Sequence, residues 1–475
     1  MNPYKKLLKC LLLFCATLIF LSCTSRFGEA AAYYVAQGGN DDNPGTEARP
    51  WASLDKAADT MKAGDTVYVK DGTYSGFDVS RSGTPDNYIS YLAYTGATPK
   101  IGQIYFQNGA SYNRFVGFEI TPASGGGVIM DHNNDRNIIS RCHIHQSESV
   151  GIDLSGGSDF NIIEDCIVYD VLYAFHTSGT TNRGNIFRRN VCYNTSDDGV
   201  NFSPSTQDTQ FLNNKIYNAA DDGIHCFDDG AAIISGNIVY NCKGVALWPH
   251  GSGGIITKNN TVVGISGEKW GYVVWLEGSN HTLKNNIIYV DAADMQLLTG
   301  GGSGRIDYNC WYNVKGTASK VGTHDIVADP KFVNVATNDY HLQSTSPCIG
   351  AGEGGVDMGA YGVAGGGGGG AILPGEEIKV LNRPNPFRAG KQITWIEYDL
   401  SQASNVIITI YDSLGQEVWR KSYEAGENGG RVDDNIIPWD GRNSSGNVVA
   451  NGGYVCRIWI ERENKSIVRK IAVAK

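Results

Sequence analysis

The sequence is poor in charge, in proline and in long apolar runs. Charged residues make up 19% of the 475 positions, there are only 14 Pro and 5 Met, and the one long apolar run lies at the extreme N-terminus. The formal charge is −10, and no basic stripe is available to replace the counterions of a phosphate backbone. The negative charge and the missing basic stripe argue against nucleic acid as a partner.

Glycine and tyrosine are abundant instead. The chain has 60 Gly and 25 Tyr, so glycine occurs at nearly one residue in eight, without the three-residue period of collagen. Short Val, Ile, Tyr and Phe runs alternate with Asn, Asp and Gly, which is the composition of strands and tight turns. The sequence therefore predicts an all-β protein with a large buried core and disfavours a helical bundle.

Residues 1–32 are typical of an export signal. A lysine-rich start precedes the apolar stretch 11–21, which is too short to span a bilayer comfortably. Cleavage after Ala30–Ala32 suits an ordinary signal peptidase, whereas residues 20–23 form an imperfect lipobox that would make Cys23 a lipid anchor. Removal of the signal takes away four cations and one anion and changes the net charge from −10 to −13.

An internal repeat dominates the middle of the chain. Phrases such as Ile234-Ser-Gly-Asn237 and Leu283-Lys-Asn-Asn286 recur every 23–26 residues, and an apolar column follows two positions later. A three-strand coil of this length cannot bury its inward side chains alone, so the period predicts a solenoid of stacked β-coils. The Asn column is expected at a turn, in the left-handed conformation, with amides bonded from coil to coil. The repeat column is Cys142, Cys166, Asn190, Asn214, Asn237, Asn260, Asn286 and Asn309, and the apolar column is Ile144, Val168, Cys192, Ile216, Val239, Val262 and Ile288.

Residues 33–362 resemble the right-handed parallel β-helix proteins. The N-terminal phrase, from Tyr33-Tyr-Val-Ala to Gly72-Thr-Tyr, is similar to the cap and first coil of that family, and Asp329-Pro-Lys-Phe to Asp357-Met-Gly-Ala-Tyr is similar to its final coil. Within the cap, Ser53 is expected to begin an amphipathic helix that runs to Lys62 and plugs the open end. The resemblance implies fold rather than activity.

The C-terminal part reads as a glycine-rich linker, 363–375, followed by a small β-domain, 376–475. Alternation in 406–411 and 454–459 predicts half-buried antiparallel strands. Pro384-Asn-Pro-Phe387 and Trp439-Asp-Gly-Arg442 resemble the Ig-like domain of the flagellar hook-capping protein and the C-terminal sorting domains of surface proteins. The resemblance implies attachment to the cell envelope or to secretion machinery.

The cysteines show no zinc-site spacing. No CxxC occurs, and the eight cysteines beyond the signal fall largely in apolar or repeat columns, which favours small buried side chains. Cys142 and Cys166 stack on adjacent coils, so a disulfide between them is a second interpretation for an exported protein.

Two acidic turns 24 residues apart are the strongest functional signal. They occupy the same place in consecutive coils, and the ~4.8 Å strand spacing would bring four carboxylates together. Carboxylates that close repel one another unless a cation or a shared proton compensates, and Ca²⁺ is the natural oxygen-ligand ion. The alternative is ordinary turn chemistry with the side chains in solvent. The predicted metal ligands are Asp197, Asp198, Asp221 and Asp222.

The strand after each acidic turn predicts an outward polar column, Asp153, His176, Asn201, His225 and Ala246. Histidines in such a groove suit general-base or hydrogen-bonding roles, although a solvated face with chance histidines has the same pattern. Neighbouring side chains would add charge and sugar-stacking surfaces. The predicted substrate contacts are Asp153, Asn201, Trp248, His250 and Trp275, with Asp228, Asp229, Lys269 and Trp270 nearby.

Ser196-Asp-Asp-Gly-Val-Asn201 resembles the calcium-binding turn of polysaccharide lyase family 9. The resemblance implies Asp197 and Asp198 as calcium ligands and a lysine as the base that abstracts a proton from a uronate. Asn201 stands where the family has another aspartate, and the matching lysine position is expected at Ala246. Lys243, His225 or His176 would therefore be the catalytic base.

Three functions remain open from the sequence. A lyase of an extracellular acidic polysaccharide would need calcium and give an unsaturated product. A β-helical glycoside hydrolase would divide the aspartates into acid and base. A surface adhesin would bind glycan without turnover. In each case the expected protein is secreted or on the cell surface, and monomeric.

Overall fold

The computed structural model describes residues 30–362 and 380–474, apart from short internal gaps at 86, 180, 229, 265–270, 292–294, 301–303, 316–321, 384, 391–393, 401–402, 427–428, 431–432 and 463–464. Nearly all of the expected signal, including Cys23, and the linker 363–375 lie outside the described residues. No helix among the described residues is long and apolar enough to cross a membrane.

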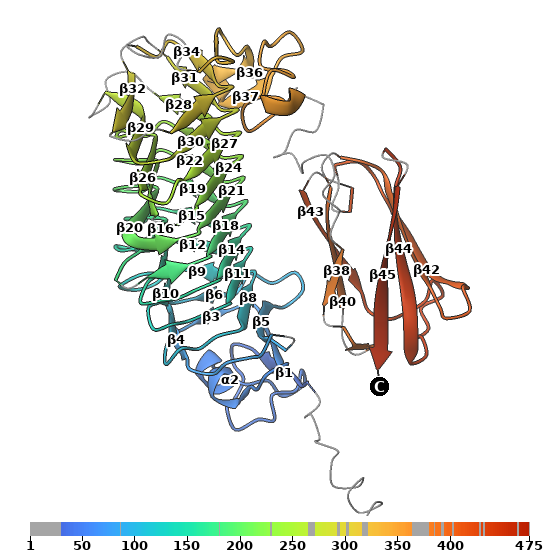
Figure 1. Cartoon of the computed structure of the whole chain (residues 1–475). Coiled ribbons are helices and arrows are strands. Elements are labelled where there is room, and N and C mark those ends of the chain that lie inside the picture. Colours follow the sequence, from blue (N-terminus) through green and yellow to red (C-terminus); the bar gives the residue numbers. More distant parts are fainter. Residues whose placement is uncertain are drawn as a thin grey trace, which may run out of the picture.

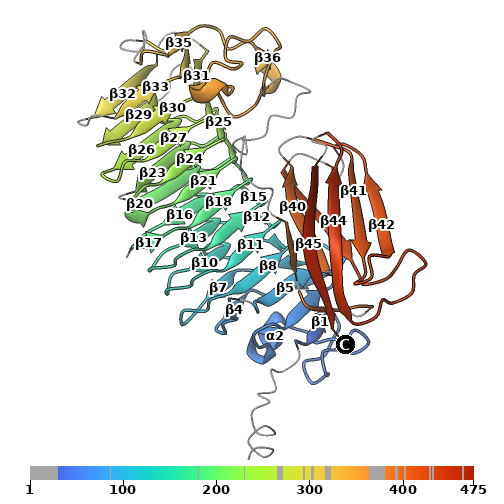
Figure 2. The same ribbon diagram turned by 45° about the vertical axis from the view of Figure 1, so that its right-hand side comes forward.

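Three parallel sheets wind together into a solenoid (Figures 1 and 2). The first sheet contains β1 (Ala32–Val35), β2 (Thr66–Val69), β5 (Ile89–Ala93), β8 (Asn113–Val116), β11 (Ile138–Ser140), β14 (Ile162–Glu164), β18 (Ile186–Arg188), β21 (Gln210–Leu212), β24 (Ile233–Ser235), β27 (Ile256–Lys258), β30 (Thr282–Lys284) and β33 (Arg305–Asp307). The second sheet contains β4 (Phe77–Val79), β7 (Ile104–Phe106), β10 (Val128–Met130), β13 (Ile152–Leu154), β16 (Phe175–Thr177), β20 (Val200–Gln207), β23 (Ile224–Asp228), β26 (Leu247–Gly251), β29 (Tyr272–Gly278) and β32 (Gln296–Gly300), with β17 (Asn182–Arg183) paired to β20. The third sheet contains β3 (Thr73–Tyr74), β6 (Lys100–Ile101), β9 (Glu119–Ile120), β12 (His143–His145), β15 (Ile167–Tyr169), β19 (Val191–Tyr193), β22 (Lys215–Tyr217), β25 (Ile238–Tyr240), β28 (Thr261–Gly264), β31 (Ile287–Val290), β34 (Cys310–Tyr312) and β35 (Ile326–Val327).

The predicted apolar column is confirmed as the inward face of the third sheet. Its residues pair directly from coil to coil, beginning with Ile144 to Val168 and ending with Val262 to Ile288. Each is fully buried. Burial of one apolar side chain per coil at this register explains why the period is so regular.

The predicted Asn column is confirmed as a hydrogen-bonded ladder at a buried corner. The backbone N–H of Asn190 donates to the amide oxygen of Asn214 at 2.9 Å, and Asn214 does the same to Asn237 at 2.8 Å. The expected left-handed backbone is wrong for the column itself. The preceding residues adopt it, for example Arg189 (φ 56°) and Asn213 (φ 55°), and this bend turns the next Asn side chain into the corner.

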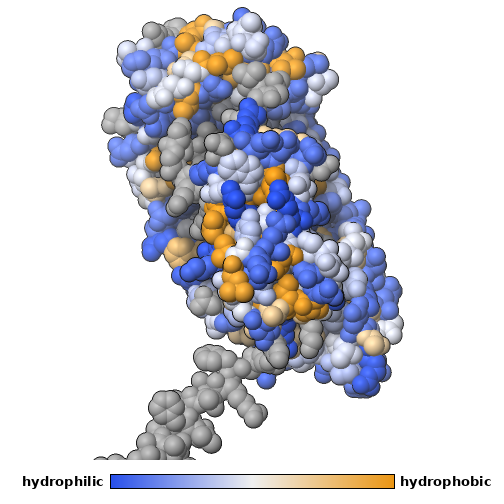
Figure 3. Space-filling view, turned by 90° about the vertical axis from the view of Figure 1, so that its right-hand side faces the viewer, coloured by the Kyte–Doolittle hydropathy of each residue, from blue (hydrophilic) through white to orange (hydrophobic). Residues whose placement is uncertain are grey.

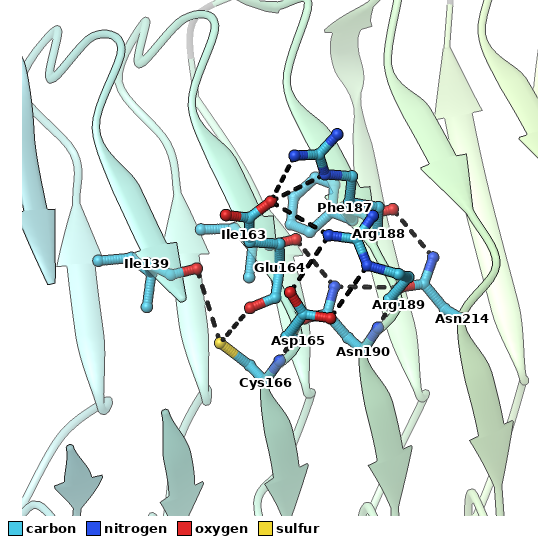
Figure 4. A network of polar contacts seen from close by, with 10 residues as sticks. All are labelled: Ile139, Ile163, Glu164, Asp165, Cys166, Phe187, Arg188, Arg189, Asn190 and Asn214. Atoms are coloured by element: carbon cyan, nitrogen blue, oxygen red, sulfur yellow. Dashed lines mark hydrogen bonds and ion pairs between the residues drawn. The ribbon is translucent and has the colours of Figure 1, made fainter. Parts of the chain in front are cut away.

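A charged network lies beside the Asn ladder (Figure 4). The Glu164 carboxylate accepts hydrogen bonds from Arg188 at 2.5 Å and Arg189 at 3.4 Å, and Arg189 also pairs with Asp165 at 3.0 Å. All four charges belong to two consecutive coils. The network therefore ties these coils together on the outside of the corner, while the amides do so on the inside.

Both ends of the solenoid are covered. The expected N-terminal helix is confirmed as α2 (Leu54–Thr60), and its cap residue Ser53 accepts a hydrogen bond from the Lys56 N–H at 3.1 Å. The other end is followed by the antiparallel pair β36 (Phe332–Asn334) and β37 (Asp339–Leu342), the 3₁₀ turns η2 (Val335–Thr337) and η3 (Glu353–Gly355), and the segment up to residue 362.

The C-terminal domain has two sheets around one core, and their strands are antiparallel except that β39 pairs with β45 in parallel. One sheet contains β38 (Leu381–Arg383), β40 (Thr394–Leu400) and β43 (Asp433–Trp439); the other contains β39 (Phe387–Arg388), β45 (Lys465–Ala474), β44 (Gly452–Ile460), β41 (Val406–Tyr411) and β42 (Glu417–Tyr423). The strands expected at 406–411 and 454–459 are confirmed. Leu414 and Val468 are strongly exposed here. In Figure 3 the apolar surface is broken up by hydrophilic side chains.

Candidate functional site

The two acidic turns connect the third sheet to the second sheet in consecutive coils. Asp197 and Asp198 lie between β19 and β20, and Asp221 and Asp222 occupy the same place between β22 and β23. Strand pairing between β20 and β23 aligns Val200 with Ile224, so the two turns are stacked in register. The expected stacking of the four aspartates is therefore confirmed.

Oxygen atoms of Asp197, Asp198 and Asp221 all lie within 4.8 Å of one another. A second group, in which Asp198 and Asp222 combine with His225, meets the same limit. Asp198 and Asp222 are 5% and 4% exposed, whereas Asp197 and Asp221 are half-buried. The carboxylates thus form one cluster that runs from the surface inwards, which differs from aspartates splayed into solvent.

Hydrogen bonds hold the buried half of this acidic cluster. One oxygen of Asp198 accepts the backbone N–H of Asp222 at 2.9 Å, and the other accepts the side-chain amide of Asn201 at 2.6 Å. Asp222 accepts the N–H of Val245 from the next coil at 2.6 Å. The amide of Asn201 therefore contacts the acidic cluster. The resemblance to polysaccharide lyase family 9 places an aspartate at this position.

Gly244 closes the cluster on one side, and sequence reasoning did not single it out. It stands one coil beyond Asp221, and its N–H donates to the Asp221 carbonyl at 2.7 Å. A Cβ at Gly244 would lie 2.3 Å from an Asp222 carboxylate oxygen and 2.4 Å from one of Asp221. Only glycine allows the backbone to approach these carboxylates so closely.

Tyr173 closes the other side and was also missed. It occupies the place of Asp198 one coil earlier, and its hydroxyl donates to the Asp197 carboxylate at 3.1 Å. Burial, the hydrogen bond to Asp197 and the nearby carboxylates raise the pKa of Tyr173 to about 12, so the phenol stays neutral. A tyrosine that follows Leu172 at a coil corner looks like ordinary packing in the sequence.

Burial raises the pKa of Asp198 to about 6, and repulsion from Asp197 and Asp221 adds to this effect. The hydrogen bonds from Asp222 and Asn201 act in the opposite direction. The cluster is therefore short of positive charge. A cation bound to these oxygens would relieve the repulsion, and carboxylate oxygens are the ligands that Ca²⁺ prefers. The residues present fit a calcium ion.

The outward column runs along the second sheet. Strand pairing places Asp153, His176, Asn201, His225 and Trp248 on successive coils. The prediction of Ala246 as the last member is wrong. Ala246 is fully buried at the position of Gly223, because Gly244 matches Asp221 rather than the glycine after the acidic pair. The matching outward residue is Trp248, not a lysine.

Asp153 and His176 form a pair next to the acidic cluster. His176 Nδ1 lies 3.2 Å from Asp153 Oδ1, which also accepts a hydrogen bond from Ser155 at 2.5 Å. The His176 ring stacks on Tyr173 with ring centroids 5.4 Å apart. Both side chains are partly exposed, His176 to 23%. A carboxylate at Nδ1 leaves the second ring nitrogen of His176 as the proton acceptor.

His225 is placed differently. Its Nε2 atom is buried and has no hydrogen-bond partner, and its ring stacks on Trp248 with centroids 4.2 Å apart. Burial, with a smaller contribution from His250, lowers the pKa of His225 to about 4. The imidazole is therefore neutral at ordinary pH and suits a ligand or hydrogen-bonding role beside Asp198 and Asp222 better than an exposed base.

An aromatic stack continues the column beyond His225. Trp248 lies between His225 and Trp275, and the two indole centroids are 4.3 Å apart at an interplanar angle of 4°. The Trp248 indole N–H donates to Glu277 at 3.1 Å, and His250 lies 3.8 Å from the same carboxylate. Both faces of Trp248 are thus occupied, so a sugar could reach only its edge. Glu277 is a further polar residue that the sequence did not reveal.

The remaining predicted residues are scattered. Lys243 is exposed at the turn that precedes Gly244, so it lies at the rim of the acidic cluster. Asp228 is fully buried, where it accepts backbone hydrogen bonds from residues 208, 209 and 230, so its expected place on the surface is wrong. Asp229, Lys269 and Trp270 lie outside the described residues.

Comparison with known proteins agrees with this architecture. A model of the Pel9A-like right-handed β-helix region matches residues 33–287. The chain belongs to this Pel9A-like family. A model of the FlgD Ig-like domain matches residues 385–459, which is the C-terminal sandwich.

Individual relatives of this Pel9A-like chain are distant. It is 26% identical over 204 residues to the pectate lyase PEL9 of Emericella nidulans, and that match covers 36% of this chain and 49% of the relative. The solved structure of pectate lyase Pel9A is 17% identical, covers 72% of this chain and 98% of its own, and has a TM-score of 0.53. A rhamnogalacturonan lyase, also 17% identical, covers 67% of this chain and 96% of its own, with a TM-score of 0.50. At these identities the structures show the right-handed β-helix fold alone.

Proposed function

We propose that this chain is an exported polysaccharide lyase that uses Ca²⁺ to cleave a uronate-containing polysaccharide. The observation that carries the proposal is the acidic cluster of Asp197, Asp198 and Asp221, open at the surface and flanked by an outward histidine held by a carboxylate. A relative of similar sequence is a pectate lyase, which supports the same chemistry.

Asp197, Asp198 and Asp221 would hold the ion, and Asp222 with His225 would support it from the interior. Calcium bound there would neutralise the uronate carboxylate of the substrate and make the adjacent C–H bond more acidic. The chain carries net negative charge, so a polyanionic substrate would otherwise be repelled.

The proposed base is His176. Asp153 lies at its Nδ1 atom, which leaves Nε2 as the nitrogen that would accept a proton. It would take the proton from the carbon next to the uronate carboxylate. The electron pair left on that carbon would then form the double bond as the glycosidic C–O bond breaks, and the departing oxygen would take up a proton from solvent. Lys243 at the rim is the second candidate, and His225 the third, because its Nε2 atom is buried. Trp248, His250 and Trp275 would contact sugar rings beyond the cleavage point.

The geometry favours the lyase over a glycoside hydrolase. Asp197, Asp198 and Asp221 each place one oxygen within 4.8 Å of the others, and three converging carboxylates suit joint coordination of an ion better than the acid–base pair of a glycosidase. Hydrolysis and binding without turnover remain outcomes of the test below.

The two ends of the chain complete the proposal. Residues 1–32 would direct export, with cleavage before residue 33 or lipidation at Cys23, and 363–375 would link the β-helix to a domain that spans 376–475. That domain would attach the protein to the cell envelope or secretion machinery, in line with its FlgD Ig-like match. The enzyme itself would act as a monomer on an extracellular polysaccharide.

The test is an absorbance assay for unsaturated product with pectate, alginate and glycosaminoglycans, in Ca²⁺ or in EDTA. We expect a calcium-dependent rise that Asp197→Asn and Asp221→Asn abolish. The matched control is Asp170→Asn, an exposed turn aspartate outside the acidic cluster whose left-handed backbone (φ 52°) Asn tolerates. No rise with any polymer would overturn the lyase, and release of reducing ends in the same samples would identify a hydrolase instead.

A further inference from the structure

The β-helix domain ends in residues 328–362, called here the C-terminal segment, which carry a cysteine that faces the last coil of the solenoid. Cys310 begins β34, and Cys348 lies 38 residues later, after β37. Both side chains are fully buried. They belong to one apolar cluster, together with Phe332, Tyr340 and Met358. The two residues therefore meet at the junction between the coil and the segment that covers it.

The two thiols are in direct contact. The Cys310 thiol interacts with that of Cys348 through a side-chain hydrogen bond, and its sulfur also lies 3.4 Å from the Ala328 carbonyl oxygen. Backbone hydrogen bonds hold Cys348 in place, since its N–H donates to the Ser346 hydroxyl at 3.1 Å and its carbonyl accepts the Met358 N–H at 2.9 Å.

The geometry of the other thiol pair is less suitable. Cys142 and Cys166 also contact each other, but they occupy equivalent positions on adjacent coils, where the strand spacing is ~4.8 Å. A disulfide needs Cβ atoms about 3.5–4.5 Å apart, so a regular column with this spacing holds its Cβ atoms slightly too far apart. Cys348 lies in the segment after β37 and not in a coil of the solenoid, so the spacing between coils does not restrict it.

We propose that Cys310 and Cys348 form a disulfide that fastens the C-terminal segment to the last coil. The oxidant is a disulfide donor, either a small molecule such as oxidised glutathione or a thiol–disulfide oxidoreductase. The two cysteine thiols lose two protons and two electrons to form the S–S bond, and the donor disulfide is reduced to two thiols.

The bond would covalently secure a segment that is already held by polar contacts. Glu353 pairs with Lys284 and with Arg305, at 2.6 Å each, and the Gly359 N–H donates to Asn285 at 2.8 Å. The inference does not depend on the lyase proposal, because it requires no substrate and no calcium.

The test is oxidation of the purified full chain in a glutathione redox buffer during refolding, followed by alkylation in denaturant without reductant and peptide mapping. We expect a peptide pair containing Cys310 and Cys348, lighter by two hydrogen atoms and unmodified by the alkylating agent. Cys192, Cys226 and Cys456, which are buried elsewhere, serve as internal controls that become alkylated. Alkylation of both Cys310 and Cys348 to the same extent as the controls would overturn the proposal.

A second measurement separates the bond from the packing. In the oxidised wild type, reductant should lower the thermal midpoint of unfolding, whereas Cys348→Ser should unfold at one temperature with or without reductant. If reductant leaves the thermal midpoint of the wild type unchanged, packing and ion pairs alone hold the segment, and the proposal fails.

Discussion

The hydroxyl of Tyr173 donates a hydrogen bond to the Asp197 carboxylate of the next coil at 3.1 Å. The same ring stacks on His176. One tyrosine thus touches both the proposed calcium ligands and the proposed base. It orients an aspartate without adding charge, because its pKa of about 12 keeps it neutral.

Tyr173→Phe should weaken calcium binding. The substitution keeps the stacked ring and removes only the donor that orients Asp197. Loss of an orienting partner typically costs tenfold or more in metal affinity, so we expect the calcium dissociation constant to rise roughly tenfold. Isothermal titration with calcium measures this. The control is Tyr193→Phe, a half-buried tyrosine in the third-sheet stack away from the acidic cluster. Equal affinity in Tyr173→Phe and wild type would contradict an orienting role.

Calcium binding should fall away below about pH 6. The raised pKa of Asp198 means that this carboxyl gains its proton there, and a protonated carboxyl is a poor ligand. Calcium binding thus strengthens as pH rises, whereas the contribution of Asp198 to the stability of the calcium-free fold weakens as pH rises. Because the folded-state pKa exceeds the unfolded value, this group stabilises the fold below about pH 4, and that contribution is lost as pH rises through about 6.

Thermal midpoints of calcium-free protein across this pH range test the second statement. We expect Asp198→Asn to remove the part of the pH dependence that lies between about pH 4 and pH 6, since the amide does not titrate. An unchanged profile in Asp198→Asn would show that another group is responsible. Asp170→Asn, which should retain the wild-type profile, is the matched control.

His176→Ala should reduce turnover about 10²- to 10⁴-fold while the calcium dissociation constant stays within about twofold, because a general base contributes to the reaction and not to ion binding. Asp153→Asn should lower kcat less, since it removes the negative partner that orients the imidazole but leaves the base itself. His132→Ala is the control, because His132 also pairs with an adjacent aspartate, Asp131, but lies away from the acidic cluster. Full activity in His176→Ala would transfer the role to Lys243.

Asn214→Ala should destabilise the solenoid by about 3 kcal/mol. The Asn214 amide accepts from the Asn190 N–H and donates to the Phe187 carbonyl, and its loss leaves both groups buried without a partner. Denaturant unfolding measures the change. Asn241→Gly, at an exposed left-handed position (φ 54°), should cost well under 1 kcal/mol. A small effect at Asn214 would mean that water or a shifted corner replaces the ladder.

The fold could be predicted because each coil repeats the same physical problem. An apolar residue every 23–26 positions and, in most coils, an Asn two positions before it are sufficient to identify a stacked solenoid, and the hydrogen bonds from Asn190 to Asn214 and from Asn214 to Asn237 confirm it. The acidic turns were predictable for the same reason, since Asp197 and Asp221 stand at identical places.

Other parts of the site were hidden from the sequence. Gly244 occupies the place of Asp221, so the outward residue of that coil is Trp248 and not the expected Ala246. Tyr173 reaches Asp197 only through the length of its side chain. The stacking of Trp248 between His225 and Trp275 also depends on ring rotamers, which no spacing rule specifies. Equivalent positions can be counted along a repeat, but side-chain reach cannot.

Gly244 also sets a limit on how the site could grow. A repeat protein can enlarge a surface simply by copying one coil, and a third Asp-Asp turn at residues 244–245 would be the natural way to create a second cation position. A side chain at Gly244 would collide with the carboxylates of Asp221 and Asp222 as they stand. A larger acidic site would therefore require those two carboxylates to turn away first, so ion capacity in this solenoid cannot increase by duplication alone.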